Sequence, residues 1–144
     1  MSSLSSKDRD QILRRLEEWR TLEDQDSQFF MKMASEAERK FLKTLYRRLS
    51  YDSLRHSSIL SSVRNILTSN QRATAKVKSE DLRLIKDHLT AETETIIYAG
   101  NLAKRIPDKN IKFLLNQIVA DENQHHKILA HVSKESESKP AKRR

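Results

Sequence analysis

The stretch that decides the fold spans residues 111–132 and reads IKFLLNQIVADENQHHKILAHV. Its hydrophobic residues recur at helical spacing between Ile111 and Val132, which predicts an amphipathic helix. Near its centre Glu122 and His125 are three residues apart, so both side chains project from one face of that helix. A carboxylate and an imidazole placed this way can bind one metal ion, although ordinary solvated helices also carry such pairs. A metal site therefore requires further ligands from the rest of the chain.

The composition predicts a single all-α domain. The 144 residues include one glycine and two prolines, and helix-breaking residues are thus very scarce. There is no cysteine, which excludes disulfides, thiolate metal sites and a cysteine nucleophile. No hydrophobic run is long enough to span a membrane, and the N-terminus does not resemble a signal peptide. We therefore expect a cytoplasmic location with no membrane contact.

Hydrophobic spacing predicts four helices, over about 7–35, 35–68, 79–106 and 109–132, joined in the middle by a polar link at 69–78. Ser35 and Glu38 have the spacing of a capping box, which predicts the start of the second helix there. Pro107 should end the third helix, and Asp108 should cap the fourth. The link is long enough to let the second and third helices run parallel by a crossover, or antiparallel by a simple turn, and both topologies stay open.

The C-terminal segment 133–144 has a different character from the helices. It is polar up to Ser138 and then basic, ending in Lys139-Pro140-Ala141-Lys142-Arg143-Arg144. Such a composition cannot bury a hydrophobic face, so we expect a disordered basic tail. The tail contributes to a formal net charge of +8, which suits an acidic partner or nucleic acid, although a solvated end is the simpler interpretation.

The two halves of the chain repeat each other with a shift of 69 residues. Between residues 13–63 and 82–132, 13 of 51 positions are identical without a gap. Three of the identical pairs are ionisable and could bind a metal, namely Glu23/Glu92, Asp52/Asp121 and His56/His125. The repeat predicts two duplicated helical hairpins, at 7–68 and 79–132.

Each predicted hairpin carries a carboxylate near the middle of its first helix and an imidazole near the middle of its second. In antiparallel helices these positions lie at the same depth. If the two hairpins pack together, five possible metal ligands meet at one level of a four-helix bundle, namely Glu23, His56, Glu92, Glu122 and His125. The hydrophobic stripes are interrupted at this level, and a carboxylate within such a stripe is costly unless it is paired or binds a metal.

These residues resemble the ligand pattern of the ferritin-like superfamily, and within it the rubrerythrin-type di-iron carboxylate proteins. That resemblance covers about residues 10–132 and implies a ferritin-like four-helix bundle over 7–132. The family places one glutamate on each of its first and third helices, and a Glu-x-x-His pair on each of the other two. The resemblance implies that the five residues above are metal ligands, and that Asp52 and Asp121 accept hydrogen bonds from ligating imidazoles.

The sequence departs from the family pattern on the second helix, where Ser53 stands in place of a glutamate. Asp52 cannot replace it, because one residue along a helix is a rotation of about 100°. Asp26 and His88 are alternative ligands from neighbouring turns. Thr95 occupies a position where rubrerythrins often carry an additional glutamate. These departures predict one well-bound ion, or an asymmetric pair of ions.

The resemblance implies a metal-binding protein that uses iron or manganese, with oxidase or peroxidase activity on oxygen or peroxide as the expected reaction class. It also allows a homodimer. The alternative is a non-catalytic helical interaction module that keeps a degenerate metal site and contacts an acidic partner or nucleic acid through its basic tail. We expect His126 and His131 to lie at the surface.

Overall fold

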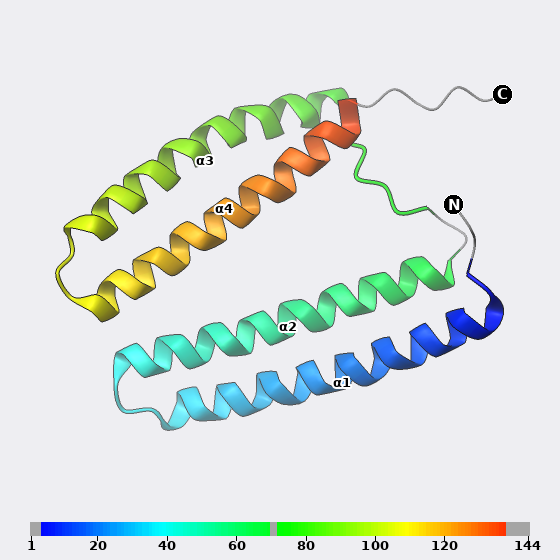
Figure 1. The fold of residues 1–144 in the computed structure, drawn as a ribbon, viewed down its shortest axis with the longest axis horizontal. Coiled ribbons are helices and arrows are strands. Elements are labelled where there is room, and N and C mark those ends of the chain that lie inside the picture. The colour runs from blue at the N-terminus through cyan, green and yellow to red at the C-terminus, as the bar shows by residue number, and fades with distance from the viewer. Residues whose placement is uncertain (1–3, 70–71, 138–144) are drawn as a thin grey trace. The chain divides into compact units, whose positions relative to one another are not determined.

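The computed structural model describes residues 4–69 and 72–137, and it holds four α-helices within those ranges. They are α1 (Ser6–Glu36), α2 (Lys40–Thr68), α3 (Ser79–Arg105) and α4 (Lys109–Glu137) (Figure 1). No strand occurs in this part of the chain. The predicted all-α class is therefore confirmed.

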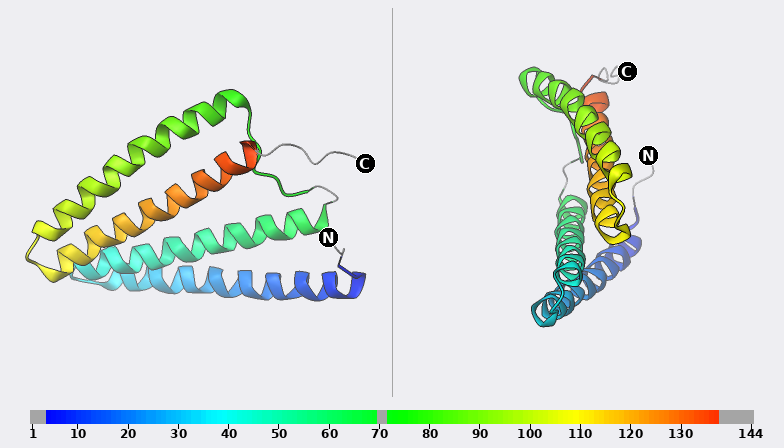
Figure 2. Two further views of the ribbon diagram at one scale, coloured as in Figure 1. Left: turned by 45° about the horizontal axis from the view of Figure 1, so that its top comes forward. Right: turned by 90° about the vertical axis from the view of Figure 1, so that its left-hand side faces the viewer.

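The helices form two units, the first built on α1 and α2 and the second on α3 and α4. Within each unit the two helices run antiparallel and lie side by side (Figures 1 and 2). The two helical hairpins expected from the repeat are thus present. The ferritin-like packing of one hairpin on the other, and the choice between a crossover and a simple turn, stay predictions.

Small residues let α1 and α2 approach closely. Ser27 on α1 and Ser50, Ser53 and Ser57 on α2 are all buried, as is Ala34. The Ser50 hydroxyl donates to the Ser27 carbonyl at 2.8 Å, and the two hydroxyl oxygens are 3.0 Å apart. These bonds satisfy polar groups that would otherwise be buried without partners. The interface of this hairpin is therefore narrow, and it is polar at its centre.

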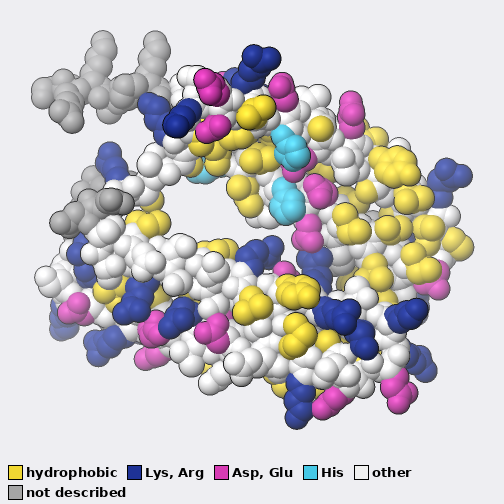
Figure 3. All heavy atoms as spheres, turned by 180° about the vertical axis from the view of Figure 1, so that it is seen from behind, with side chains coloured by type: hydrophobic (Ala, Val, Ile, Leu, Met, Phe, Trp, Pro, Cys, Tyr) yellow, Lys and Arg dark blue, Asp and Glu magenta, His cyan; other side chains and the backbone are white. Residues whose placement is uncertain are grey.

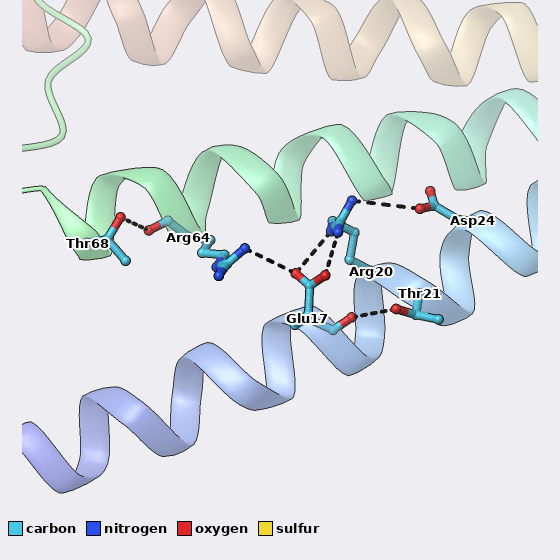
Figure 4. A network of polar contacts seen from close by, with 6 residues as sticks. All are labelled: Glu17, Arg20, Thr21, Asp24, Arg64 and Thr68. Carbon is cyan, nitrogen blue, oxygen red and sulfur yellow. Dashed lines mark hydrogen bonds and ion pairs between the residues drawn. The ribbon is translucent and has the colours of Figure 1, made fainter.

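An ion-pair network also joins the two helices of the first hairpin. Glu17 on α1 accepts from Arg20 one turn later, at 2.5 and 3.2 Å, and lies 3.5 Å from Arg64 on α2 (Figure 4). Arg20 in turn lies 3.9 Å from Asp24. Because these groups are partly exposed, the network contributes little to the stability of the hairpin.

The two hairpin turns differ in how well the sequence predicts them. Asp108 caps α4 as expected, because its Oδ1 atom accepts from the backbone N–H groups of Asn110 and Ile111 at 2.8 and 3.0 Å. The capping box predicted at residues 35–38 is wrong. Ser35 stays inside α1 and donates its hydroxyl to the Lys32 carbonyl, so α2 begins only at Lys40, without a side-chain cap.

The last helix continues beyond the predicted boundary. We expected disorder from residue 133, but α4 extends to Glu137, and the remaining tail residues 138–144 lie outside the described part of the chain. Ser133 is buried, while Glu135 accepts from the Ala75 N–H at 2.9 Å and Ser136 accepts from the Val77 N–H at 3.0 Å. The polar side chains of this segment therefore extend the helix by binding the backbone of the chain that precedes α3.

Large hydrophobic side chains remain exposed on both hairpins, and Figure 3 shows such side chains at the surface. Among the described residues the buried hydrophobic ones are only Ala34, Leu60 and Ala103. This follows from geometry, because a pair of helices covers one face of each helix and leaves the opposite face open. No helix in the described ranges combines the length and the hydrophobicity that a membrane span needs.

Candidate metal centre

Three side chains of the second hairpin form a compact group of possible metal ligands. Glu92 comes from the middle of α3, and Glu122 and His125 come from the middle of α4. Each offers one ligand atom, and these atoms all lie within 4.8 Å of one another. The antiparallel hairpin thus brings together, within one unit, three of the five ligands that the sequence predicts.

The group has a buried end and an open end. The exposed fraction of the side chain rises from 8% for Glu92 to 25% for Glu122 and 52% for His125. The His125 Nδ1 atom lies 3.8 Å from the Glu122 Oε2 atom. An ion bound here would be held from inside the hairpin by a carboxylate and would face solvent on the imidazole side.

The Glu92 carboxylate is only partly satisfied by the protein. Its Oε1 atom lies 3.4 Å from the His88 Nε2 atom, one turn earlier on α3. Its Oε2 atom is buried and has no hydrogen-bond partner. A buried carboxylate oxygen without a partner is costly, and a cation removes that cost. The residues present therefore fit a metal ion, because carboxylate and imidazole groups are metal ligands and because this buried oxygen has no other partner.

The first hairpin holds a smaller group at the equivalent place. The Glu23 Oε1 atom lies 3.4 Å from the His56 Nδ1 atom and accepts a hydrogen bond from the Trp19 indole at 3.1 Å. Ser53, which replaces the expected glutamate, is buried beside α1. Within the described ranges no third ionisable side chain completes this pair in the way that Glu122 completes the other group.

The structure brings Glu23 together with His56, and Glu92 together with Glu122 and His125. The prediction that all five residues share one site stays a prediction, because the two groups belong to separate units. Of the two supporting aspartates, Asp52 has partners other than an imidazole. Asp52 lies 3.6 Å from Arg48 and 3.3 Å from Arg55, both on its own helix. The expected role of Asp52 and Asp121 in orienting imidazoles is likewise still a prediction.

Among the alternative ligands, only His88 lies beside the candidate group. Asp26 is exposed on α1, and the Thr95 hydroxyl donates to the Ala91 carbonyl of its own helix at 3.2 Å. His88 contacts Glu92 directly, although its ring is largely exposed.

The burial of the neighbouring histidines corrects one expectation. His131 is exposed, as expected, and lies 3.3 Å from Glu135. His126 is half-buried and is more covered than the candidate ligand His125. The reason is its spacing of four residues from Glu122, which carries it back to the same side of α4. Its counterpart in the repeat, Ser57, is buried too.

Comparisons of the chain with protein-family models, with curated proteins and with solved structures find no match. The resemblance to ferritin-like proteins therefore rests on the ligand pattern and the repeat alone.

Proposed function

We propose that the chain is a metal-binding protein that holds one iron or manganese ion through Glu92, Glu122 and His125. The observation that carries the proposal is the buried Glu92 Oε2 atom, which lacks a partner although two other ligand side chains are within reach. Two carboxylates balance the charge of a divalent ion, and oxygen and imidazole donors suit iron and manganese. Three protein ligands leave coordination positions for water or a small substrate.

The finer proposal is a ferritin-like protein that acts as an oxidase or peroxidase. A bound iron or manganese ion would supply one-electron chemistry toward oxygen or peroxide. The residues of the chain would hold the ion, keep its inner side shielded through Glu92, and leave its outer side accessible through His125. As the resemblance implies, Glu23 and His56 would complete the ligand set if the hairpins pack together.

The metal content of the reconstituted protein tests the proposal. Purified chain is loaded anaerobically with Fe²⁺ or Mn²⁺, freed of unbound ions and analysed for metals. We expect about one ion per chain, and a loss of affinity of at least about tenfold for Glu92→Gln, which removes the charge but keeps the shape.

Glu94→Gln is the matched control, because Glu94 is an exposed carboxylate on the same helix. It should bind metal like the unmodified chain. Absence of iron, manganese and zinc after reconstitution would refute the proposal, and so would equal loss from both variants.

The alternative function is a non-catalytic interaction module. The observation in its favour is the set of large hydrophobic side chains exposed on both hairpins, such as Phe29, Leu54 and Ile97. In this case the basic segment 139–144, which lies outside the described residues, would contact an acidic partner or nucleic acid. Nucleic-acid affinity should then fall steeply with added salt and with deletion of that segment. Lack of any binding at low salt would exclude the nucleic-acid version.

A further inference from the structure

The two oxygens of the Glu92 carboxylate have different surroundings. Oε1 faces the His88 Nε2 atom at 3.4 Å, whereas Oε2 is buried without a partner. The His88 side chain is 63% exposed, so it lies at the surface of α3. The imidazole thus contacts one oxygen of the carboxylate, and the other oxygen is available to bind an ion.

A related contact occurs in the first hairpin, where a tryptophan takes the place of the histidine. The shift of 69 residues makes Trp19 the counterpart of His88 and Glu23 the counterpart of Glu92. The Trp19 indole nitrogen donates to the Glu23 Oε1 atom at 3.1 Å. In both hairpins a ring nitrogen four residues earlier therefore contacts one oxygen of the interior glutamate. Indole nitrogen is not a metal ligand, so the shared feature is a ring nitrogen that contacts one carboxylate oxygen, and in Trp19 this nitrogen donates a hydrogen bond.

We infer that His88 is a positioning residue, whose imidazole fixes Glu92 through Oε1 and so directs Oε2 toward the metal ion. The inference rests on the proposed function and adds a residue that acts through Glu92 without itself binding the ion. Groups that orient a ligating side chain in this way typically change metal affinity by about 10- to 100-fold. The cause is preorganisation, because a carboxylate already fixed loses less freedom on binding.

The test is a Mn²⁺ titration of the full chain, with unbound Mn²⁺ measured by electron paramagnetic resonance. His88→Phe keeps an aromatic ring and removes the N–H group, and should weaken binding by about tenfold or more while one ion still binds at saturation. His88→Trp copies the residue of the first hairpin and restores an N–H group that cannot bind metal. It should keep the affinity within about threefold of the unmodified chain.

His131→Phe is the matched control, because His131 contacts Glu135 through the same spacing of four residues, at 3.3 Å. It should leave the affinity unchanged. Equal weakening in His88→Phe and His88→Trp would overturn the inference in favour of His88 as a direct ligand. Unchanged affinity in His88→Phe would also overturn it. A lack of Mn²⁺ binding by the unmodified chain would instead refute the proposed function, and the two failures are thereby distinguished.

Discussion

The Glu92 side chain is the only buried ionisable group among the described residues. Burial of a carboxylate away from a cation costs free energy, and one of its oxygens has no hydrogen bond to offset that cost. The surroundings of its counterpart Glu23 differ, because Trp19 donates a hydrogen bond to Glu23 and His56 lies close to it. At the scale of single residues, Glu92 is thus the position where a bound ion would change the energy of the fold most.

A second residue of interest is Glu17, whose effect on stability depends on pH. The hydrogen bond from Arg20 lowers the pKa of Glu17 below its ordinary value of 4.5, and the charge of Arg64 acts in the same direction. A lowered pKa in the folded state stabilises the fold above pH 4.5, and this contribution disappears as the pH falls through the lowered pKa.

We therefore expect Glu17→Gln to lower the melting temperature by a few degrees at most at pH 7, because the group is exposed. The difference from the unmodified chain should be smaller at pH 3 than at pH 7, because Glu17 gains a proton as the pH falls through its lowered pKa. Thermal unfolding followed by circular dichroism measures both values, with the exposed neighbour Glu18→Gln as control. A difference that persists unchanged at pH 3 would contradict the role of the charge.

At the scale of elements, the two hairpins share one repeated sequence pattern but form two different groups of polar side chains. Ser53 and Glu122 occupy equivalent positions on α2 and α4, and Ser53 is buried. The serines on α2 allow close packing against α1, whereas the glutamate on α4 completes a group of three ligands. The first hairpin has therefore kept the helix contact but lacks a carboxylate for a second ion.

This difference predicts the outcome of Ser53→Glu. The substitution adds a carboxylate beside Glu23 and His56, and should raise the bound Mn²⁺ from about one to about two ions per chain. Without metal the variant should be less stable, because the added charge is buried. Metal analysis and thermal unfolding measure the two effects, and Ser58→Glu at an exposed position of α2 is the control. A stoichiometry that stays at one, in a folded variant, would contradict this account of the first hairpin.

The sequence predicted the helices well where interactions within a short segment determine the structure. The spacing of hydrophobic residues gave all four helices, and the Asp108 cap follows from the side chain itself. The capping box at Ser35 failed because that hydroxyl can equally bond back to its own helix. The extension of α4 through Ser133 was missed because it depends on contacts with residues 74–77, which no local pattern reveals.

The candidate site was also predicted in part from the sequence. Glu92, Glu122 and His125 could be predicted because antiparallel helices of similar length bring mid-helix residues to one depth. The half-burial of His126 was missed, although its spacing of four residues from Glu122 carried the signal. Packing of one hairpin on the other would involve whole exposed faces instead of a motif. The joining of Glu23 and His56 to the metal site therefore remains a prediction.

At the scale of the whole molecule, the duplication gives two hairpins that each expose a hydrophobic face and each hold a carboxylate next to an imidazole. The ferritin-like proposal explains both features by packing these faces together around a metal. The interaction-module alternative explains the hydrophobic faces but gives no reason for the unpartnered oxygen of Glu92.

The most direct test of the central claim is the position of the metal in crystals of the loaded protein, measured by anomalous scattering above and below the iron or manganese absorption edge. We predict an anomalous peak in direct contact with Glu92, Glu122 and His125, which disappears below the edge. A fully loaded crystal with no peak at these three side chains, or with its peak elsewhere, would contradict the proposed function.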